Sequence, residues 1–165
     1  MALTEIERKL NKLGKEVIKR YPSINYGGCC VYAAIVATEL KKYKIDACGI
    51  VASRSAGETD YSIDQARNNI NKNTVQSWEN NGIVLSHIGL EFEVGGKKKH
   101  YDTKGVRPAS RYLGDLTIYK GRFQHAELKQ LAAKKSGWND HFNRRDIPAI
   151  RKLVQNRLAV DTTSV

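Results

Sequence analysis

The residues best suited to chemistry lie in one short stretch, 25–40, where two glycines precede two cysteines and an alanine-rich run. Cys29 falls at the predicted start of a buried helix. There, free backbone N–H groups and the positive end of the helix dipole stabilise a thiolate, the form of cysteine that attacks carbonyl carbons. Gly27 and Gly28 carry no side chain, which lets another chain approach closely. The pattern predicts a cysteine nucleophile.

A nucleophilic cysteine needs a base that takes its proton and a third group that orients this base. His87 lies at the start of the longest predicted strand, and Asp102 lies on the return strand of the same hairpin. Because a hairpin places its two strands side by side, the imidazole and the carboxylate can meet at one point. The helix that begins at Cys29 is expected to bring its sulfur to the edge of the sheet near His87. The spacing therefore predicts a Cys29-His87-Asp102 triad.

These segments resemble the nucleophile helix and the His and Asp strands of the papain-like and transglutaminase-like thiol enzymes. The resemblance covers about residues 24–106, through the motifs Gly27-Gly-Cys29, Tyr32-Ala33, Leu40, Ile45, Ala47, Ser86-His87, a Gly-Gly hairpin and Tyr101-Asp102-x-x-Gly105. It implies a papain-like (transglutaminase-like) α+β fold, in which a nucleophile helix packs on an antiparallel sheet with flanking helices. It also implies that Cys29, His87 and Asp102 are the catalytic residues.

The resemblance favours Cys29 over its neighbour Cys30 as the nucleophile. Counted from Cys29, Tyr32 and Ala33 fall on the aromatic and alanine positions of the family. Many papain-like enzymes bind the oxyanion with an upstream Gln, which has no counterpart in this chain. Asn25 is therefore the candidate oxyanion donor, together with the backbone N–H of Cys29.

Each of these residues also has a structural interpretation. Cys29 and Cys30 could be small buried residues at a tight turn, and His87 could be a hydrogen-bonded histidine of the sheet. Asp102 could serve the turn that precedes Gly105.

Other residues are expected to be structural. His100 is a rival base, but it shares a strand with Asp102, while His125 and His141 are expected to be cap or surface residues. Cys48 is expected to be a buried strand residue. The aromatic residues expected in the core rather than at a substrate site are Tyr26, Trp78, Tyr112 and Trp138.

The elements that must position the triad follow from periodicity and caps. A capping residue, Thr4, starts an amphipathic helix that ends before Pro22. A central helix over Cys29–Tyr43 and a buried strand over Ile45–Ala52 follow. Residues 53–82 are polar, with short helical patterns, and are expected to contact the substrate.

The second half predicts a sheet and two closing helices. Strands over 83–94 and 97–103 form a hairpin at Gly95-Gly96, and a further strand is expected at 116–119. Helices are expected over 125–135 and 146–158, the last one capped by Asp146. The order of elements predicts an α+β fold with one domain over residues 1–165.

Composition restricts the class of protein. The chain has 165 residues, 41% of them hydrophobic, without an apolar run near the ~18–20 residues that span a bilayer. The first residues are charged where a signal peptide is apolar, so a cytoplasmic protein without membrane partners is expected. Three cysteines, two of them adjacent, do not suggest a disulfide framework, and without CxxC or HExxH no metal or cofactor is expected.

The net charge is +11 and the sequence pI is about 9.6. This balance suits an acidic partner, nucleic acid included. The positive charge is spread along the whole chain, which does not favour a dedicated nucleic-acid surface.

Together these features predict a thiol hydrolase or acyl-transfer enzyme that acts on a protein or peptide. Peptidase, deamidase, isopeptidase and transglutaminase share this chemistry, and arylamine N-acetyltransferases use a similar order of Gly-Gly-x-Cys, His and Asp. The alternative is a non-catalytic binding or inhibitor module of the same fold that contacts an acidic protein or nucleic acid. Small size and basicity would also suit a phage or mobile-element effector in a host cytoplasm.

Overall fold

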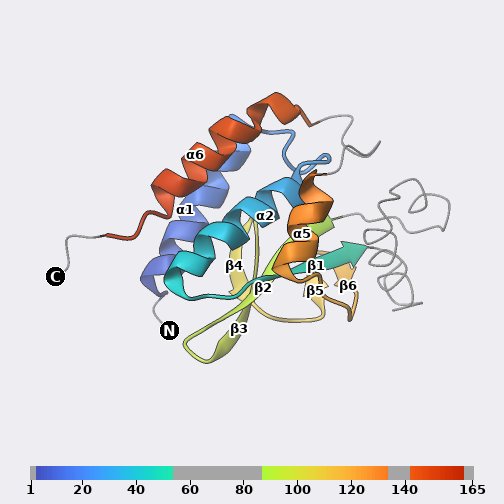
Figure 1. Cartoon of the computed structure of the whole chain (residues 1–165). Coiled ribbons are helices and arrows are strands. Elements are labelled where there is room, and N and C mark those ends of the chain that lie inside the picture. The colour runs from blue at the N-terminus through green and yellow to red at the C-terminus, as the bar shows by residue number, and fades with distance from the viewer. Residues whose placement is uncertain (1–2, 54–86, 134–141, 162–165) are drawn as a thin grey trace.

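The computed structural model describes residues 3–53, 87–133 and 142–161, and Figure 1 shows how their helices and strands are arranged. The helices are α1 (Glu5–Arg20), α2 (Cys29–Leu40), α5 (His125–Ala133) and α6 (Ile147–Arg157), with 3₁₀ helices η1 (Lys41–Tyr43) and η3 (Arg144–Asp146). The strands are β1 (Cys48–Ser53), β2 (His87–Val94), β3 (Lys97–Asp102), β4 (Gly105–Pro108), β5 (Tyr112–Leu113) and β6 (Leu116–Ile118). They form an antiparallel sheet in the order β4-β3-β2-β1-β6-β5, which confirms the predicted α+β class.

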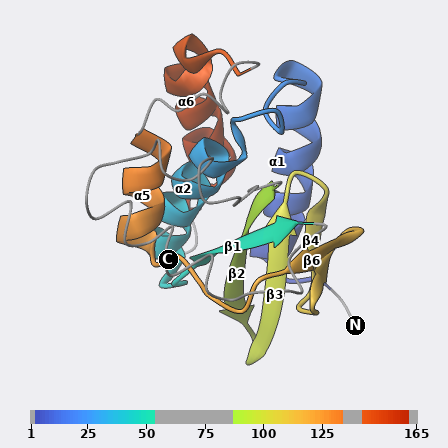
Figure 2. The ribbon, with the colours of Figure 1, turned by 90° about the vertical axis from the view of Figure 1, so that its right-hand side faces the viewer.

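Helix α2 is the centre of the main core. All of its residues except Thr38 are buried, as expected for a helix that is apolar around its whole circumference. The helix packs against β2 on one side and against α5 and α6 on others. Figure 2 shows α2, α5 and α6 together on one side of the strands. A smaller apolar cluster, which includes Ile50 and Ala52, lies on the other face of the sheet.

Helix α1 begins as its sequence predicts. The Thr4 hydroxyl accepts a hydrogen bond from the Glu7 backbone N–H, and the Glu7 carboxylate accepts one from the Thr4 N–H. This capping box satisfies two backbone donors that would otherwise lack partners. The apolar face of α1 is buried, and the helix contacts β4 and α6.

The β2–β3 hairpin turns at two glycines with positive φ, Gly95 at 60° and Gly96 at 73°. A two-residue turn of this kind favours glycine at both positions and fits the twist of the strands. Leu90 lies opposite Tyr101, so the first residue of β2 and the last residue of β3 lie at the same end of the hairpin. That end is where the predicted base and its orienting carboxylate lie.

Several predicted boundaries differ from the structure. The central α-helix ends at Leu40 and continues only as the 3₁₀ helix η1, and β1 begins at Cys48 rather than at Ile45. Strands β4 and β5 were not predicted, because both are too short to show an alternating pattern. The short helices predicted within 53–82 lie outside the described residues.

Asp146 occupies the N-cap position of α6, as predicted, but it does not cap the helix with its side chain. Asp146 belongs to η3 and makes no capping hydrogen bond with its side chain, whereas Asn143 accepts one from the Arg145 N–H. The last helix is therefore entered through an extra 3₁₀ turn. Pro148 lies in the first turn of α6, as expected.

Two of the aromatic residues expected in the core are exposed. Tyr26 is 66% exposed and Tyr112 is 44% exposed, and the Tyr112 ring stacks under the Arg111 guanidinium. Trp78 and Trp138 lie outside the described residues. Within the described residues, no helix has the length and apolar character that crossing a membrane requires.

Candidate active site

Three elements meet where the sequence predicts the triad. Cys29 is the first residue of α2, His87 is the first residue of β2, and Asp102 is the last residue of β3. All three side chains line one small cavity of about 10 Å³. A cavity of this size holds about one water molecule, so the three groups lie close to one another.

The N-terminus of α2 comes close to its neighbours because residue 28 is a glycine. A Cβ atom at Gly28 would lie 2.7 Å from the Ile24 carbonyl oxygen and 2.7 Å from a ring carbon of Phe142. Both contacts are shorter than real Cβ atoms tolerate. The close approach that the glycine pair predicts is therefore present, and it sets the position of Cys29.

The imidazole of His87 is held by Asp102. The His87 Nε2 atom lies 3.0 Å from Asp102 Oδ2, and the two side chains are 14% and 6% exposed. Since Nε2 is occupied by the carboxylate, the Nδ1 atom is the ring nitrogen left for the sulfur of Cys29. The His87 imidazole and the Cys29 sulfur belong to the same cavity and shift each other's pKa, so the order is sulfur, imidazole, carboxylate.

The two reacting groups shift each other's pKa toward an ion pair. Burial alone raises the pKa of the Cys29 thiol, but the hydrogen bond and charge of His87 and smaller backbone contributions together outweigh burial, so the pKa is lowered. Burial alone lowers the pKa of His87, but hydrogen bonds with Asp102 and Cys29 raise this pKa to about 9. The two shifts have opposite signs, and both favour a thiolate beside an imidazolium.

Backbone groups add to the stabilisation of the thiolate. Hydrogen bonds from the backbone at Ile88 and Cys30 also lower the pKa of Cys29. The first N–H groups of a helix have no partner within it, so the start of α2 supplies such donors. These contacts agree with the expectation from the sequence that the thiol lies at a helix N-terminus.

Asp102 has further partners that the sequence analysis missed. Its Oδ1 atom accepts a hydrogen bond of 2.9 Å from the Lys104 backbone N–H and lies 2.7 Å from Nη2 of Arg107. The Arg107 contact is an ion pair, and Nη2 makes no hydrogen bond with a described residue. Burial raises the pKa of Asp102, but His87, Arg107 and the Lys104 N–H together lower it.

A signal for Arg107 exists in the sequence. Asp102-x-x-Gly105 is typical of a tight turn, and a return strand after that turn would bring Arg107 back beside β3. In the structure Gly105 has a φ of 111° and opens β4, in which Arg107 lies opposite His100.

Asn25, the candidate oxyanion donor, lines the same cavity. Its Nδ2 atom donates a hydrogen bond of 3.1 Å to the Thr103 hydroxyl, and Thr103 is the residue that follows Asp102. An amide nitrogen carries two hydrogens, so one remains for an oxyanion. The contact with Thr103 orients the amide of Asn25 at the edge of the site.

The other cysteines lie in different surroundings. Cys30 points away from the triad and makes a weak contact of 3.8 Å with the Leu128 carbonyl oxygen, and burial raises its pKa well above the usual value. Cys48 lies in β1, half-buried, and burial raises its pKa as well. Among the three thiols, Cys29 alone has a lowered pKa.

The rival histidines are engaged elsewhere. His100 is buried, and its Nε2 atom lies 2.7 Å from Oε2 of Glu91, which also binds Arg122. His125 lies at the start of α5 with its Nε2 atom 3.0 Å from the Thr38 hydroxyl. His141 lies outside the described residues. Within residues 3–53, 87–133 and 142–161, no group of three His, Cys, Asp or Glu side chains is placed to hold a metal ion.

The chain was compared with models of protein families, with curated protein sequences and with solved structures, and none of the three comparisons gives a match. The functional conclusion therefore depends on the geometry and electrostatics of the site itself.

Proposed function

We propose that this protein is a thiol hydrolase or acyl-transfer enzyme of the papain-like (transglutaminase-like) kind, with Cys29, His87 and Asp102 as its catalytic residues. The observation that carries the proposal is that all three residues line one small cavity, with His87 Nε2 3.0 Å from Asp102 Oδ2 and Cys29 at the start of α2. The pKa shifts, downward for Cys29 and upward for His87, support it. A histidine that only stabilises a sheet does not require a neighbouring thiol with a lowered pKa. A cysteine nucleophile, in contrast, requires a lowered pKa of its own thiol.

The proposed reaction begins with attack of the Cys29 thiolate on the carbonyl carbon of an amide or ester. A C–S bond forms, and the carbonyl electrons move onto oxygen, where the Cys29 backbone N–H and the Asn25 amide are the proposed donors. As the oxyanion collapses, the C–N or C–O bond breaks and the leaving group takes the proton from the His87 imidazolium. The product is a thioester on Cys29.

The second half of the reaction releases the acyl group. His87 takes a proton from water or from an amine, which attacks the thioester carbon. The C–S bond then breaks, and the sulfur leaves as the thiolate beside the newly formed imidazolium. Asp102 stays ionised throughout and holds the ring of His87. Water as acceptor gives hydrolysis, and an amine gives acyl transfer.

A labelling experiment tests the nucleophile. The three cysteines are alkylated with iodoacetamide at pH 6, and the rate at each one is followed by peptide mass spectrometry. Cys29 is expected to react much faster than Cys48, whose pKa is raised. His87→Ala should slow the reaction of Cys29 but leave that of Cys48 unchanged, which makes Cys48 the internal control.

A trapping experiment tests the chemistry. The protein is mixed with an activated ester, such as p-nitrophenyl acetate, and quenched in acid, and the expected product carries one acetyl group on Cys29. Cys29→Ser should abolish this thioester and Cys30→Ser should keep it. Equal alkylation of Cys29 and Cys48, with no acyl adduct, would instead leave the non-catalytic binding module as the better description.

A further inference from the structure

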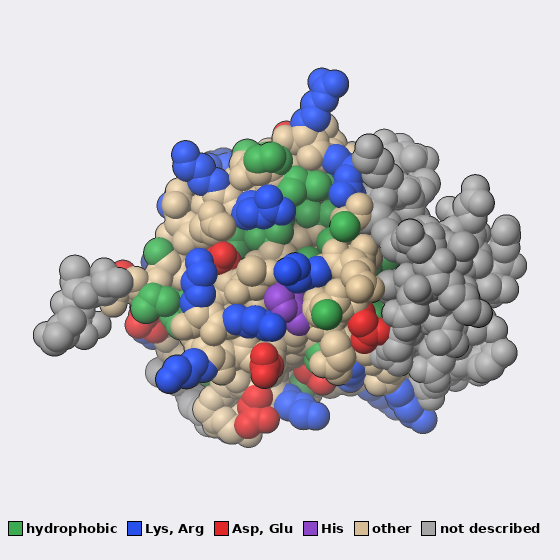
Figure 3. All heavy atoms as spheres, viewed as in Figure 1, with side chains coloured by type: hydrophobic (Ala, Val, Ile, Leu, Met, Phe, Trp, Pro, Cys, Tyr) green, Lys and Arg blue, Asp and Glu red, His purple; other side chains and the backbone are tan. Residues whose placement is uncertain are grey.

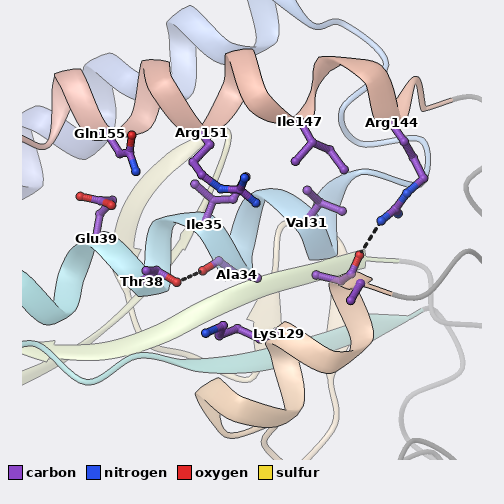
Figure 4. Close-up of a pocket in the computed structure, with 12 residues that line it drawn as sticks. Val31, Ala34, Ile35, Thr38, Glu39, Lys129, Arg144, Ile147, Arg151 and Gln155 are labelled. Atoms are coloured by element: carbon purple, nitrogen blue, oxygen red, sulfur yellow. Dashed lines mark hydrogen bonds between the residues drawn. The ribbon is translucent and has the colours of Figure 1, made fainter. Parts of the chain in front are cut away.

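A second hollow lies beside α2, separate from the Cys29 cavity. It has a volume of about 470 Å³ and lies between α2, α5 and α6 (Figure 4). Volumes of this size are typical of binding sites. The two hollows use different residues of α2, since Cys29, Tyr32 and Ala33 line the small cavity, while Val31 and Ile35 line the larger one. We call the larger hollow the α2 groove.

The floor of the α2 groove is apolar. Val31, Ala34 and Ile35 are 4%, 5% and 7% exposed, and they form a recessed stripe along α2. Figure 4 shows Ile147 projecting from α6 toward Val31 across the groove. The spacing of Val31 and Ile35 is one helical turn, so the floor presents a ridge of apolar side chains.

The rim of the α2 groove is cationic. Its three basic residues come from three different elements: Lys129 from α5, Arg144 from η3 and Arg151 from α6. Within the described part of the chain, neither Lys129 nor Arg151 has an acidic partner. Figure 3 shows, on the face seen in Figure 1, hydrophobic side chains with Lys and Arg side chains around them.

Arg144 has unused hydrogen-bonding capacity at one end of the α2 groove. Its Nη2 atom donates a hydrogen bond of 3.1 Å to the Ala132 carbonyl oxygen, whereas its Nη1 atom is buried without a partner among the described residues. The carboxylate that lines the groove, Glu39, lies 2.6 Å from Lys42 and is 4% exposed. The uncompensated charge around the groove is therefore positive.

We propose that the α2 groove binds an acidic amphipathic helix of a partner protein, because its apolar floor lies between three cations on three separate elements. The apolar side chains of that helix fill the space over Val31 and Ile35. Its Asp and Glu side chains pair with Lys129, Arg144 and Arg151. This is the helix-in-groove mode of recognition, and it does not depend on the chemistry of Cys29.

The size and charge distribution favour a helix over a small anionic ligand. This side of the groove runs from Arg144 in η3 to Gln155 in α6, about 18 Å at the rise per residue of the 3₁₀ and α helices, or about three turns of a bound α-helix. One carboxylate group could meet only one of the cations, whereas a helix of three turns presents several. Opposite charges at the rim would also steer association, because a strongly basic protein attracts an acidic partner before contact.

A display library tests the proposal with a defined probe. The library encodes amphipathic helices with Leu at the positions of an apolar stripe and random residues elsewhere, and it is selected on the whole protein. The selected peptides are expected to contain an excess of Asp and Glu over the unselected library. Their affinity, measured by fluorescence anisotropy of the labelled peptide, should fall as salt is raised.

Charge-reversal variants locate the binding site. Lys129→Glu and Arg151→Glu are each expected to weaken the selected peptides about three- to tenfold, the range for exposed ion pairs turned into repulsion. Lys152→Glu is the matched control, because Lys152 is exposed on α6 next to Arg151 but does not line the groove. Cys29→Ser should bind as tightly as the original protein, which separates this proposal from the catalytic one.

Three outcomes would overturn the proposal. The library yields no binder, the binders show no acidic excess, or they bind Arg151→Glu and Lys152→Glu equally well. Dodecanoate serves as a competing probe: if it binds and Lys129→Glu or Arg151→Glu weakens it while no helix binds, the groove takes an anionic amphiphile instead.

Discussion

Cys29 and His87 each lie in surroundings that would, by burial alone, keep them neutral. For His87, hydrogen bonds with Asp102 and with Cys29 reverse this effect and raise the pKa. For Cys29, the hydrogen bond and charge of His87, together with backbone hydrogen bonds, lower the pKa. A buried charge is stable only when it is paired. At the residue scale, therefore, the ionised state of each group depends on the presence of the other two.

An NMR titration measures this dependence. His87 is expected to titrate at about 9, above the ordinary value for histidine, because the protonated ring is stabilised by Asp102 and Cys29. Cys29→Ser removes the thiolate, so the pKa of His87 should fall. His125 is the control, since burial and nearby lysines lower its pKa and it contacts Thr38, near the end of α2 opposite Cys29. A His87 that titrates at the same pH in both proteins would contradict the thiolate–imidazolium pair.

Arg107 is expected to affect the acid side of the pH profile of Cys29 alkylation. It helps to lower the pKa of Asp102, so Arg107→Gln should raise this pKa toward the ordinary value. Asp102 ionises with a lowered pKa in the folded protein, and its support of His87 is lost as pH falls through that pKa. The rate of Cys29 alkylation should therefore decline at a higher pH in Arg107→Gln than in the original protein.

The control for this substitution is Arg111→Gln. Arg111 is exposed and stacks on the Tyr112 ring, away from Asp102. If the acid limb moves equally in both variants, the effect comes from net charge rather than from the contact between Arg107 and Asp102.

At the scale of elements, α1 supports the end of the hairpin that carries Asp102. The Asn11 side chain accepts a hydrogen bond of 2.7 Å from the Val106 N–H, and Gly14 lies directly against the backbone of Thr103. The Tyr101 hydroxyl also donates to the Leu10 carbonyl oxygen. A helix with no catalytic residue thus holds both ends of the turn that follows Asp102.

Gly14→Ala tests this support. A Cβ atom at residue 14 would lie 2.6 Å from the Thr103 carbonyl oxygen, a backbone atom that can yield only if α1 or the turn moves. The substitution is expected to lower the free energy of unfolding by roughly 1–3 kcal/mol, the usual cost of overpacking. It should also slow alkylation of Cys29, because the turn that holds Asp102 is displaced.

Lys15→Ala is the matched control in the same helix. Lys15 is exposed, and alanine at this position should leave both stability and alkylation nearly unchanged. Chemical denaturation and the labelling rate measure the two effects. An unchanged unfolding energy in Gly14→Ala would show that α1 does not press against Thr103.

At the scale of the whole molecule, the two hollows are lined by different residues of α2. The chain that contains them has a net charge of +11. The charge is spread along the chain, so its general effect differs from the local effect of the α2 groove. General attraction to polyanions follows counterion release and does not need particular cations.

Binding to duplex DNA separates these two effects. The protein is expected to bind DNA weakly, with an affinity that falls steeply as salt rises from about 50 to about 200 mM. Arg151→Glu and its control Lys152→Glu should weaken DNA binding equally, whereas only Arg151→Glu should weaken acidic peptides. Tight DNA binding that resists salt would instead indicate a dedicated nucleic-acid surface.

Local patterns in the sequence were enough to predict much of the fold. The capping box at Thr4, the glycine pair at 95–96 and the apolar run after Cys29 each specify an element through interactions between near neighbours. The α+β class followed from the order of these elements. Short strands such as β5, and the 3₁₀ turn that precedes α6, escaped prediction because packing rather than local pattern stabilises them.

The candidate site divides in the same way. The sequence alone indicated that Cys29, His87 and Asp102 could meet. It contains them in the expected order, and a hairpin joins the strands of His87 and Asp102, whose pairing follows from turn geometry and alternation. Only the tertiary structure decided that Arg107 approaches Asp102, that Asn25 is held by Thr103 and that an apolar groove with a basic rim lies beside α2. The groove and the contact of Asn25 join segments far apart in the chain, so they depend on helix packing and loop placement. The contact of Arg107 with Asp102 is closer in sequence, and there the turn pattern indicates a return strand but only the register of β4 on β3 brings the two side chains together.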